Sequence, residues 1–187
     1  IVRINSPGGT VVGGEALYFG LRAVATKKPV VAVMGEVATS AGYMTAIGAD
    51  YIVGRPSSIT GSIGVLMQTT EITGLLSKLG IKAETIKSAP LKAQPNPLEP
   101  MSPAARAAAE NIISDIYDMF VDLVTERRKM ARPAVLKIAD GRVYTGRQAL
   151  RNGLIDAIGD IDTARQWLAE HREIEKSLPL RPMKIKR

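Results

Sequence analysis

Short apolar runs alternate along this chain with segments in which apolar residues recur every three or four positions. The runs predict strands at 1–5, 29–34, 51–53, 59–66, 82–87 and 142–145, with a further short segment at 154–158. The periodic segments predict helices at 13–26, 40–48, 71–79, 102–130 and 161–173, with shorter helices after Pro133 and from Arg147. Strands and helices that alternate in short units indicate an α/β fold with mainly parallel strand pairing.

Two glycine-rich turns, at residues 6–9 and 35–43, each follow an apolar strand. Ligands of α/β sheets bind beyond the carboxyl ends of the strands, which is where both turns are expected. Ser40 lies where the second turn leads into a helix, and unpaired N–H groups there favour a developing negative charge. Ser40 is therefore a candidate nucleophile, although a helix-capping serine has the same spacing. Gly8 and Gly9 permit a close backbone approach to a substrate or a positive φ, or form a plain turn.

The chain has 187 residues, which suits one domain, and its composition limits the chemistry available. It contains no Cys, which excludes disulfides, thiolate zinc sites and a cysteine nucleophile. Its one His, His171, lies in a charged stretch and is expected on the surface. A serine nucleophile would then need a Lys, Asp or Glu as its base.

A lysine can act as such a base, because desolvation lowers the pKa of an amine. Lys87 and Lys92 flank an uncharged stretch at the end of a predicted strand, where a lysine can lie over an apolar groove. A solvated loop lysine is the alternative for both residues. The sequence contains neither of the glycine-rich phosphate-binding motifs.

The net charge is +7, of which residues 172–187 hold +4 from six basic and two acidic residues. We expect a single domain at 1–174, followed at 175–187 by a basic, solvated tail that can touch anionic lipid. The remaining charge is small and is not interleaved with aromatic residues, which argues against a nucleic-acid partner. No apolar run is long enough to span a membrane. The chain opens without Met inside a predicted strand, so we treat it as a fragment.

Six groups of residues, taken in order, resemble the signal peptide peptidase A family of serine–lysine peptidases, peptidase family S49. They are RINSPGG at 3–9, GEVATSAGY at 35–43, ITGSIGV at 59–65, IKS at 86–88 with Lys92, MSP at 101–103, and GRVYTGR at 141–147 with GLID at 153–156. Together they span nearly all of residues 1–158. The resembling enzymes are membrane-associated in bacteria and have the crotonase-like fold of the Clp peptidases. The resemblance thus implies repeated ββα units, a mainly parallel sheet and a long helix after the catalytic loop.

The same resemblance assigns roles to particular residues. It implies Ser40 as nucleophile and Lys92 as general base, with Lys87 the weaker candidate. The backbone N–H groups of Gly9 and Ala41 would form the oxyanion hole. Substrate contacts are expected from Gly8, Ser62 and Ile63, in a groove lined by the segment 59–66. No metal or cofactor is implied. Many relatives have Gly where this chain has Ala41, so the turn must accept a Cβ.

The resulting hypothesis is a serine endopeptidase that degrades cleaved signal peptides or other short apolar peptides at the bacterial inner membrane. Its membrane association would come from a segment upstream of this chain. The apolar stripe on the predicted helix 102–130, which is longer than one domain needs, indicates a homo-oligomer contact. Two alternatives stay open: an acyl-CoA enzyme of the crotonase type, for which Glu36 would be the acid or base, and a catalytically silent scaffold.

Overall fold

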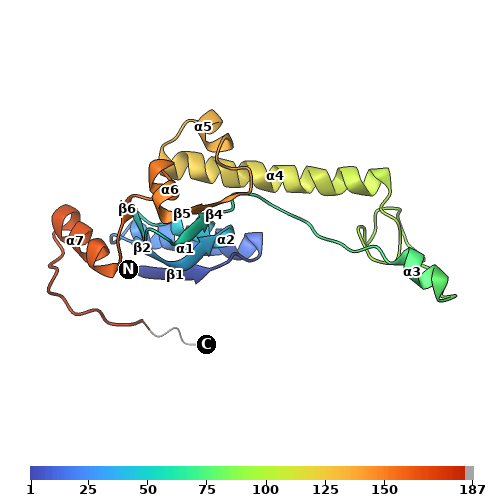
Figure 1. Cartoon of the computed structure of the whole chain (residues 1–187), viewed down its shortest axis with the longest axis horizontal. Coiled ribbons are helices and arrows are strands. Elements are labelled where there is room, and N and C mark those ends of the chain that lie inside the picture. The colour runs from blue at the N-terminus through green and yellow to red at the C-terminus, as the bar shows by residue number, and fades with distance from the viewer. Residues whose placement is uncertain (184–187) are drawn as a thin grey trace. The chain divides into compact units, whose positions relative to one another are not determined.

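The computed structural model describes residues 1–183, which form two compact units (Figure 1). The first unit comprises residues 1–64 and the residues from 120 onward, and the second comprises residues 65–119. The limits predicted for the domain, 1–174, and for the tail, 175–187, stay predictions. Three basic residues of that tail, Lys184, Lys186 and Arg187, lie outside the described residues.

The first unit is built on a six-stranded sheet (Figure 1). Its strands are β1 (Val2–Ser6), β2 (Val31–Thr39), β3 (Tyr51–Gly54), β4 (Ile59–Gly61), β5 (Val143–Thr145) and β6 (Ala157–Ile158). The order is β5-β4-β2-β3-β6, and β1 also pairs with β2. All pairings are parallel except that of β4 with β5, which confirms the mainly parallel sheet predicted from the sequence.

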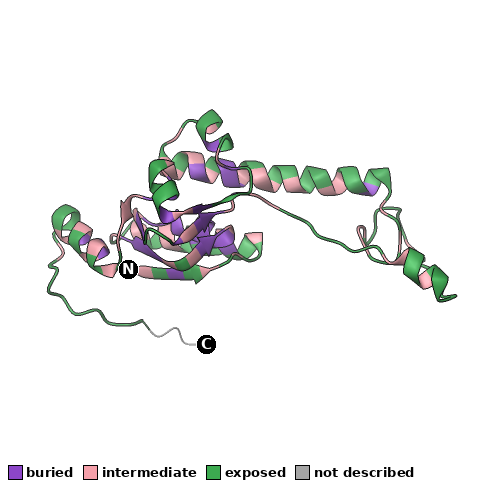
Figure 2. Ribbon diagram, viewed as in Figure 1, coloured by how far each residue is buried: buried purple, intermediate pink, exposed green. Residues whose placement is uncertain are grey.

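Strand β2 is the centre of this sheet, because β1, β3 and β4 all pair with it. Its apolar residues 31–34 are buried, as expected for a strand covered on both faces. Figure 2 shows that buried residues gather in the sheet and the helices packed on it. The carboxyl end of β2 lies beside the ends of β1 and β4, with Ser6 opposite Ala38 and Gly61 opposite Thr39.

The sequence prediction placed a turn at Gly35, and this was wrong, because β2 continues to Thr39. Gly35 serves a close approach instead: a Cβ built on it would lie 3.0 Å from Cγ of Asn5. The side chain of Asn5 accepts a hydrogen bond from the N–H of Val37 at 3.1 Å, and Ser58 donates to the carbonyl of Gly35 at 2.6 Å. These side-chain bonds lie where the pairing of β1 with β2 shifts register, because β2 has two extra residues between Met34 and Ala38 opposite Ile4–Ser6.

Two further strand predictions need correction. The strand predicted at 59–66 ends at Gly61, because Gly61 and Ser62 both have positive φ, at 85° and 53°. The strand predicted at 82–87 is absent from the second unit, where residues 81–86 are exposed and no neighbouring strand is present to pair with them.

The helices of the first unit agree with the predictions to within a few residues. They are α1 (Val11–Ala25), α2 (Ala41–Ala46), α5 (Arg132–Leu136), α6 (Gly146–Arg151) and α7 (Ile161–Arg172). Thr145 with Gln148 forms a capping box at the start of α6, and Asp160 with Thr163 forms one at the start of α7. Such local hydrogen bonds explain why these helix starts could be predicted.

The second unit contains α3 (Thr73–Lys78) and the beginning of the long helix α4 (Pro103–Arg128), which ends in the first unit. Ser102 accepts a hydrogen bond from the N–H of Ala105 and caps α4, as predicted. Ala105 is the only buried residue between positions 65 and 119. The second unit therefore has almost no apolar core of its own.

Two arginines bind the carbonyl groups that follow α2. Arg127, in the last turn of α4, donates through Nε to Ile47 at 2.9 Å and through its terminal nitrogen to Ala49 at 3.0 Å. Arg22 of α1 donates to the carbonyl of Gly48 at 3.2 Å. Because α2 has only six residues, these bonds to its carboxyl end fix a helix that is too short to be stable alone.

The neighbouring Arg128 anchors the end of α4 to the sheet. Its guanidinium binds both carboxylate oxygens of Asp156, at 2.7 and 3.0 Å, and donates to the carbonyl of Gly153 at 2.7 Å. Asp156 in turn accepts a hydrogen bond from the N–H of Ile52 in β3 at 2.7 Å. The Arg128 side chain is only 11% exposed, so this pair is shielded from water.

Replacing Arg128 with Ala removes the cation from a partly buried carboxylate, so the free energy of unfolding should fall by about 3 kcal/mol. Arg142→Ala is the control, because the pair of Arg142 with Asp140 is largely exposed. It should change the free energy of unfolding by less than about 1 kcal/mol. Urea denaturation measures both values, and equally small losses in the two variants would show that the Arg128 pair does not anchor α4.

Candidate active site

Ser40 lies between the last residue of β2 and the first residue of α2, as the sequence predicted. Its backbone has φ 54° and ψ −122°, a conformation that non-glycine residues rarely adopt and that costs about 1–3 kcal/mol. Its side chain forms no capping hydrogen bond with α2. The alternative in which Ser40 merely caps the helix is therefore wrong, and its hydroxyl is left for another use.

The backbone on both sides of Ser40 is held by hydrogen bonds. The N–H of Ser40 donates to the carbonyl of Gly61 at 2.9 Å, and its carbonyl accepts from Met44 at 2.9 Å. The hydroxyl of Thr39 donates to the carbonyl of Pro7 at 2.8 Å. These contacts tie the junction to β4, to α2 and to the loop after β1, and together they maintain the strained backbone.

The turn at residues 6–9 lies directly against Ser40. Gly8 has φ 125°, so the positive φ that the sequence allowed is present. A Cβ built on Gly8 would lie 3.0 Å from Cβ and 3.4 Å from Oγ of Ser40, so a side chain at this position cannot be accommodated without movement. At Gly9 an added Cβ would meet nothing within 4 Å, so the space beside it is open.

Gly9 and Ala41, the two residues predicted to form the oxyanion hole, line the same cavity of the first unit. Within residues 1–183, neither the N–H of Gly9 nor that of Ala41 donates a hydrogen bond to another group of the protein. Ala41 is the first residue of α2, where N–H groups have no partner inside the helix. The pair fits the predicted oxyanion hole, and that role itself stays a prediction.

The Cβ of Ala41 is accommodated by a residue that the sequence reasoning missed. Gly14 of α1 faces Ala41 so closely that a Cβ built on Gly14 would lie 2.9 Å from the Cβ of Ala41. The glycine pair at positions 13 and 14, inside a predicted helix, was the available signal, because helical glycines often mark close packing.

A cavity of about 500 Å³ adjoins the two N–H groups and lies between β1, α1 and α2. Apolar side chains form much of its wall, including Val2, Ile4, Leu17 and Leu21. Residues 8–9, which pack on Ser40, and residues 41–42, which follow it, also line the cavity. The first unit thus offers apolar space next to the candidate nucleophile.

Ser62 and Ile63 follow β4, whose last residue pairs with Thr39. The N–H of Ser62 donates to the carbonyl of Arg142 at 2.8 Å, and the carbonyl of Ile63 accepts from Gly141 at 3.1 Å. The Ile63 side chain is fully buried, so only its backbone could meet a substrate. The predicted substrate contacts of both residues stay predictions.

The two candidate lysines lie in the second unit, in the loop before α4. Lys87 forms an ion pair with Glu99 at 2.5 Å, and this bond lowers the pKa of the Glu99 carboxyl. The amine of Lys87 is therefore bound to a carboxylate. Lys92 is exposed in the same loop, and because Ser40 belongs to the other unit, the pairing of Ser40 with Lys92 stays a prediction.

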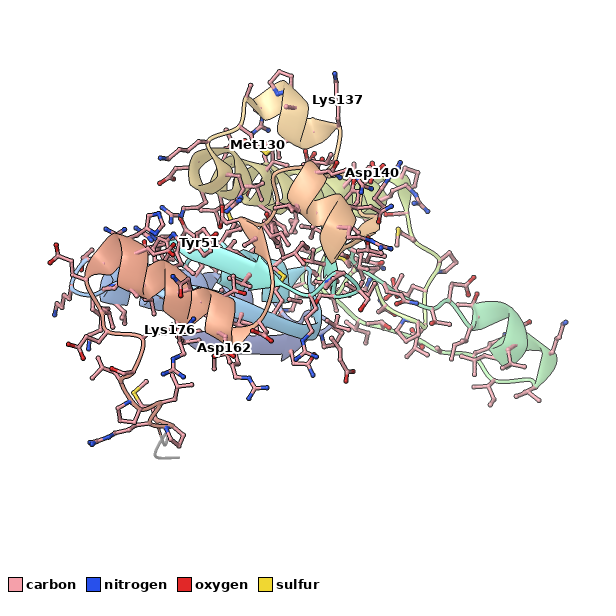
Figure 3. The ribbon with its side chains drawn as sticks, turned by 60° about the vertical axis from the view of Figure 1, so that its left-hand side comes forward. Tyr51, Met130, Lys137, Asp140, Asp162 and Lys176 are labelled. Atoms are coloured by element: carbon pink, nitrogen blue, oxygen red, sulfur yellow. The ribbon has the colours of Figure 1, made fainter. Side chains whose placement is uncertain are left out.

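His171 is exposed on α7, as predicted, and α7 lies at the opposite end of β2 from Ser40. Its ring stacks on Trp167 at 5.4 Å, and α7 packs against the beginning of β2 through Leu168, whereas Ser40 follows the end of β2. In Figure 3, α7 with Asp162 lies beside Tyr51 at the beginning of β3. This region therefore supplies no base to Ser40.

Glu36, the acid or base of the acyl-CoA alternative, is exposed within β2 rather than in the turn beside Ser40. Four residues of extended chain place Glu36 about 13 Å from Ser40. This distance weighs against the acyl-CoA alternative.

Residues 1–183 contain no group of three or more His, Cys, Asp or Glu residues that could hold a metal ion. Among the same residues, no helix is both long and apolar enough to cross a membrane.

Comparison with known proteins gives consistent matches. The model of the family described as Peptidase family S49 matches residues 22–175. A protein of Synechocystis sp., provisionally named a protease, is 39% identical over 169 residues, which are 90% of this chain and 61% of the relative. Protease 4 of Salmonella typhi is 37% identical over 177 residues, which are 94% of this chain and 28% of the relative. The chain thus spans less than two thirds of the length of each of these relatives.

A solved structure, that of a point mutant of ClpP1 from Listeria monocytogenes, matches with a TM-score of 0.55 at 15% identity. The match covers 84% of this chain and 71% of the other. It confirms the ClpP-like, crotonase-like fold that the resemblance implied.

Gly8→Ala should lower the free energy of unfolding by about 1–3 kcal/mol, because the new Cβ meets Ser40 in a backbone region that favours glycine. Gly9→Ala is the matched control and should change stability by less than about 0.5 kcal/mol. Thermal and urea denaturation measure the difference. Equal stability of the two variants would contradict the close packing of Gly8 on Ser40.

Proposed function

The chain belongs to peptidase family S49, and from that premise we propose that it is a serine endopeptidase with Ser40 as nucleophile and Lys92 as general base. The observation that carries the proposal is the strained backbone of Ser40 at the end of β2, with its hydroxyl left out of the helix cap. A serine on a sharp strand-to-helix turn presents its Oγ to a substrate at the edge of the sheet.

The reaction follows from these groups. Ser40 Oγ attacks the peptide carbonyl carbon while its proton passes to the neutral amine of Lys92. The carbonyl oxygen becomes an oxyanion and accepts hydrogen bonds from the N–H groups of Gly9 and Ala41. Lys92 then gives the proton to the leaving amine as the C–N bond breaks. The acyl group stays on Ser40 as the acyl-enzyme. Water, deprotonated by Lys92, hydrolyses that ester and restores Ser40.

Lys92 is preferred over Lys87 on chemical grounds. A general base must reach the hydroxyl whose proton it takes, and the amine of Lys87 is already bound to the Glu99 carboxylate. Lys92 is exposed within its own unit, so the bound peptide would have to supply its desolvation.

Extended apolar peptides, such as cleaved signal peptides, are the proposed substrates. The cavity beside Gly9 and Ala41 has mainly apolar walls, which suit small or aliphatic side chains. Among the described strands, β1 pairs only with β2. The edge of β1 that faces away from β2 therefore offers backbone N–H and C=O groups to an extended peptide. Action at the bacterial inner membrane and assembly as a homo-oligomer through α4 belong to the same proposal.

Ser40→Ala and Lys92→Ala should each reduce peptide hydrolysis by about four orders of magnitude, the scale expected for loss of a nucleophile or its base. Lys92→Arg should fail as well, since a guanidinium stays protonated. Hydrolysis of a fluorogenic peptide and labelling by a fluorophosphonate probe measure both steps, and circular dichroism checks that each variant is folded. Normal activity in Lys92→Ala, with loss in Lys87→Ala, would move the base to Lys87.

A synthetic signal peptide should be cleaved faster than a polar peptide of equal length, because the polar side chains would have to leave water for apolar walls. A stable folded protein should resist, because its strands are already paired. Mass spectrometry of timed digests gives the three rates. Cleavage of the polar peptide as fast as the signal peptide would contradict the apolar site.

A further inference from the structure

The carboxylate of Glu99 binds three side chains from the loop that precedes α4. Oε2 accepts from Lys87 Nζ at 2.5 Å and from Gln94 Nε2 at 2.9 Å. Oε1 accepts from Asn96 Nδ2 at 3.0 Å. The side chains of Lys87 and Glu99 are 13% and 27% exposed, so their pair is shielded in a segment that is otherwise largely open to solvent. We call these four residues the Glu99 cluster.

The Glu99 cluster brackets Lys92 in the chain. Lys87 precedes Lys92 by five positions, and Gln94 follows it by two. Between them the backbone turns twice, through hydrogen bonds from Lys92 N–H to the carbonyl of Ala89 at 3.1 Å and from Gln94 N–H to Leu91 at 3.2 Å. Both flanks of Lys92 are therefore tied to one carboxylate.

The second unit has no apolar core that could hold the loop around Lys92 in place. Ala105 is its only buried residue, and α3 buries none of its side chains. The order of a loop with so little burial depends on its polar contacts. The Lys87 ammonium, together with the Asn96 and Gln94 amides, lowers the pKa of Glu99, so the carboxylate is ionised at neutral pH and its hydrogen bonds are charge-assisted.

We propose that Glu99 is a positioning residue, which holds the loop that carries Lys92 in the conformation needed for catalysis. The proposal rests on the function proposed above, in which Lys92 is the base. Glu99 does not touch the reacting atoms. It acts through the backbone of the loop, and Lys87 takes part as the cation that pairs with it rather than as a second base. A displacement of a catalytic group by about 1 Å can cost up to about a hundredfold in rate.

Glu99→Gln tests this role, because it keeps the shape of the side chain and removes the charge that binds Lys87. We expect kcat for a fluorogenic peptide to fall between about tenfold and a hundredfold, with KM changed less than about twofold. The rate is expressed per Ser40 that a fluorophosphonate probe can label, so unfolded protein does not count. Glu84→Gln is the matched control, an exposed carboxylate in the same unit, and should behave as the unmodified chain does.

The charge swap K87E/E99K restores the ion pair with its members exchanged. If Glu99 acts by position, the double variant should recover at least about a third of the kcat that K87E alone loses, because the pair re-forms across the loop. This rescue also decides the matter if Glu99→Gln proves too unstable to measure.

The outcomes separate the two proposals. Full kcat in Glu99→Gln, with no activity in Lys92→Ala, would overturn the positioning role and leave the function standing. Full activity in Lys92→Ala would overturn both. A fall in kcat in Glu99→Gln that the charge swap fails to relieve would also reject the positioning role, since any loss of charge would then have the same effect.

Discussion

Strand β2 is buried on both faces along residues 31–34, and every other strand of the first unit takes its position from it directly or through one neighbour. β4 pairs with its carboxyl half, and Ser6 at the end of β1 lies opposite Ala38, so the loop after β1 and the end of β4 both lie beside Ser40. Movement of Ser40 would break the hydrogen bond from its N–H to Gly61 and disturb the packing against Gly8. Ser40 is therefore held in place by the centre of the sheet.

This rigidity allows a strained residue to persist at the end of the strand. The backbone of Ser40 is unfavourable by itself, and the short helix that follows could not hold it. Arg127 and Arg22 bind the three carbonyls after α2, so the helix is fixed at the end away from Ser40 by side chains from two other helices. Charged groups at the edge of the core thus support a site whose own contacts are mostly backbone.

Much of the first unit could be predicted from the sequence, because its helices have local signals such as the Thr145 and Asp160 capping boxes. The turn predicted at Gly35 was wrong. A glycine that allows a close approach to Asn5 cannot be distinguished in the sequence from a glycine that forms a turn. Ser40 was found from its position between a strand and a helix, but its φ depends on Gly61 and Gly8, which come from distant segments. Glu99 was missed because its partners meet only when the loop folds back on itself.

The contact of Gly14 with Ala41 also makes the residues tolerated at these two positions depend on each other. A methyl group at position 41 uses the space that Gly14 leaves open, so Ala41 depends on a glycine at position 14. The reverse exchange is less favourable, because a Cβ at position 14 would also lie 3.1 Å from the Cα and 3.2 Å from the carbonyl oxygen of Ala41, atoms that every residue has. Position 41 therefore has room for Gly or Ala, whereas a side chain at position 14 would require the backbone of α2 to shift.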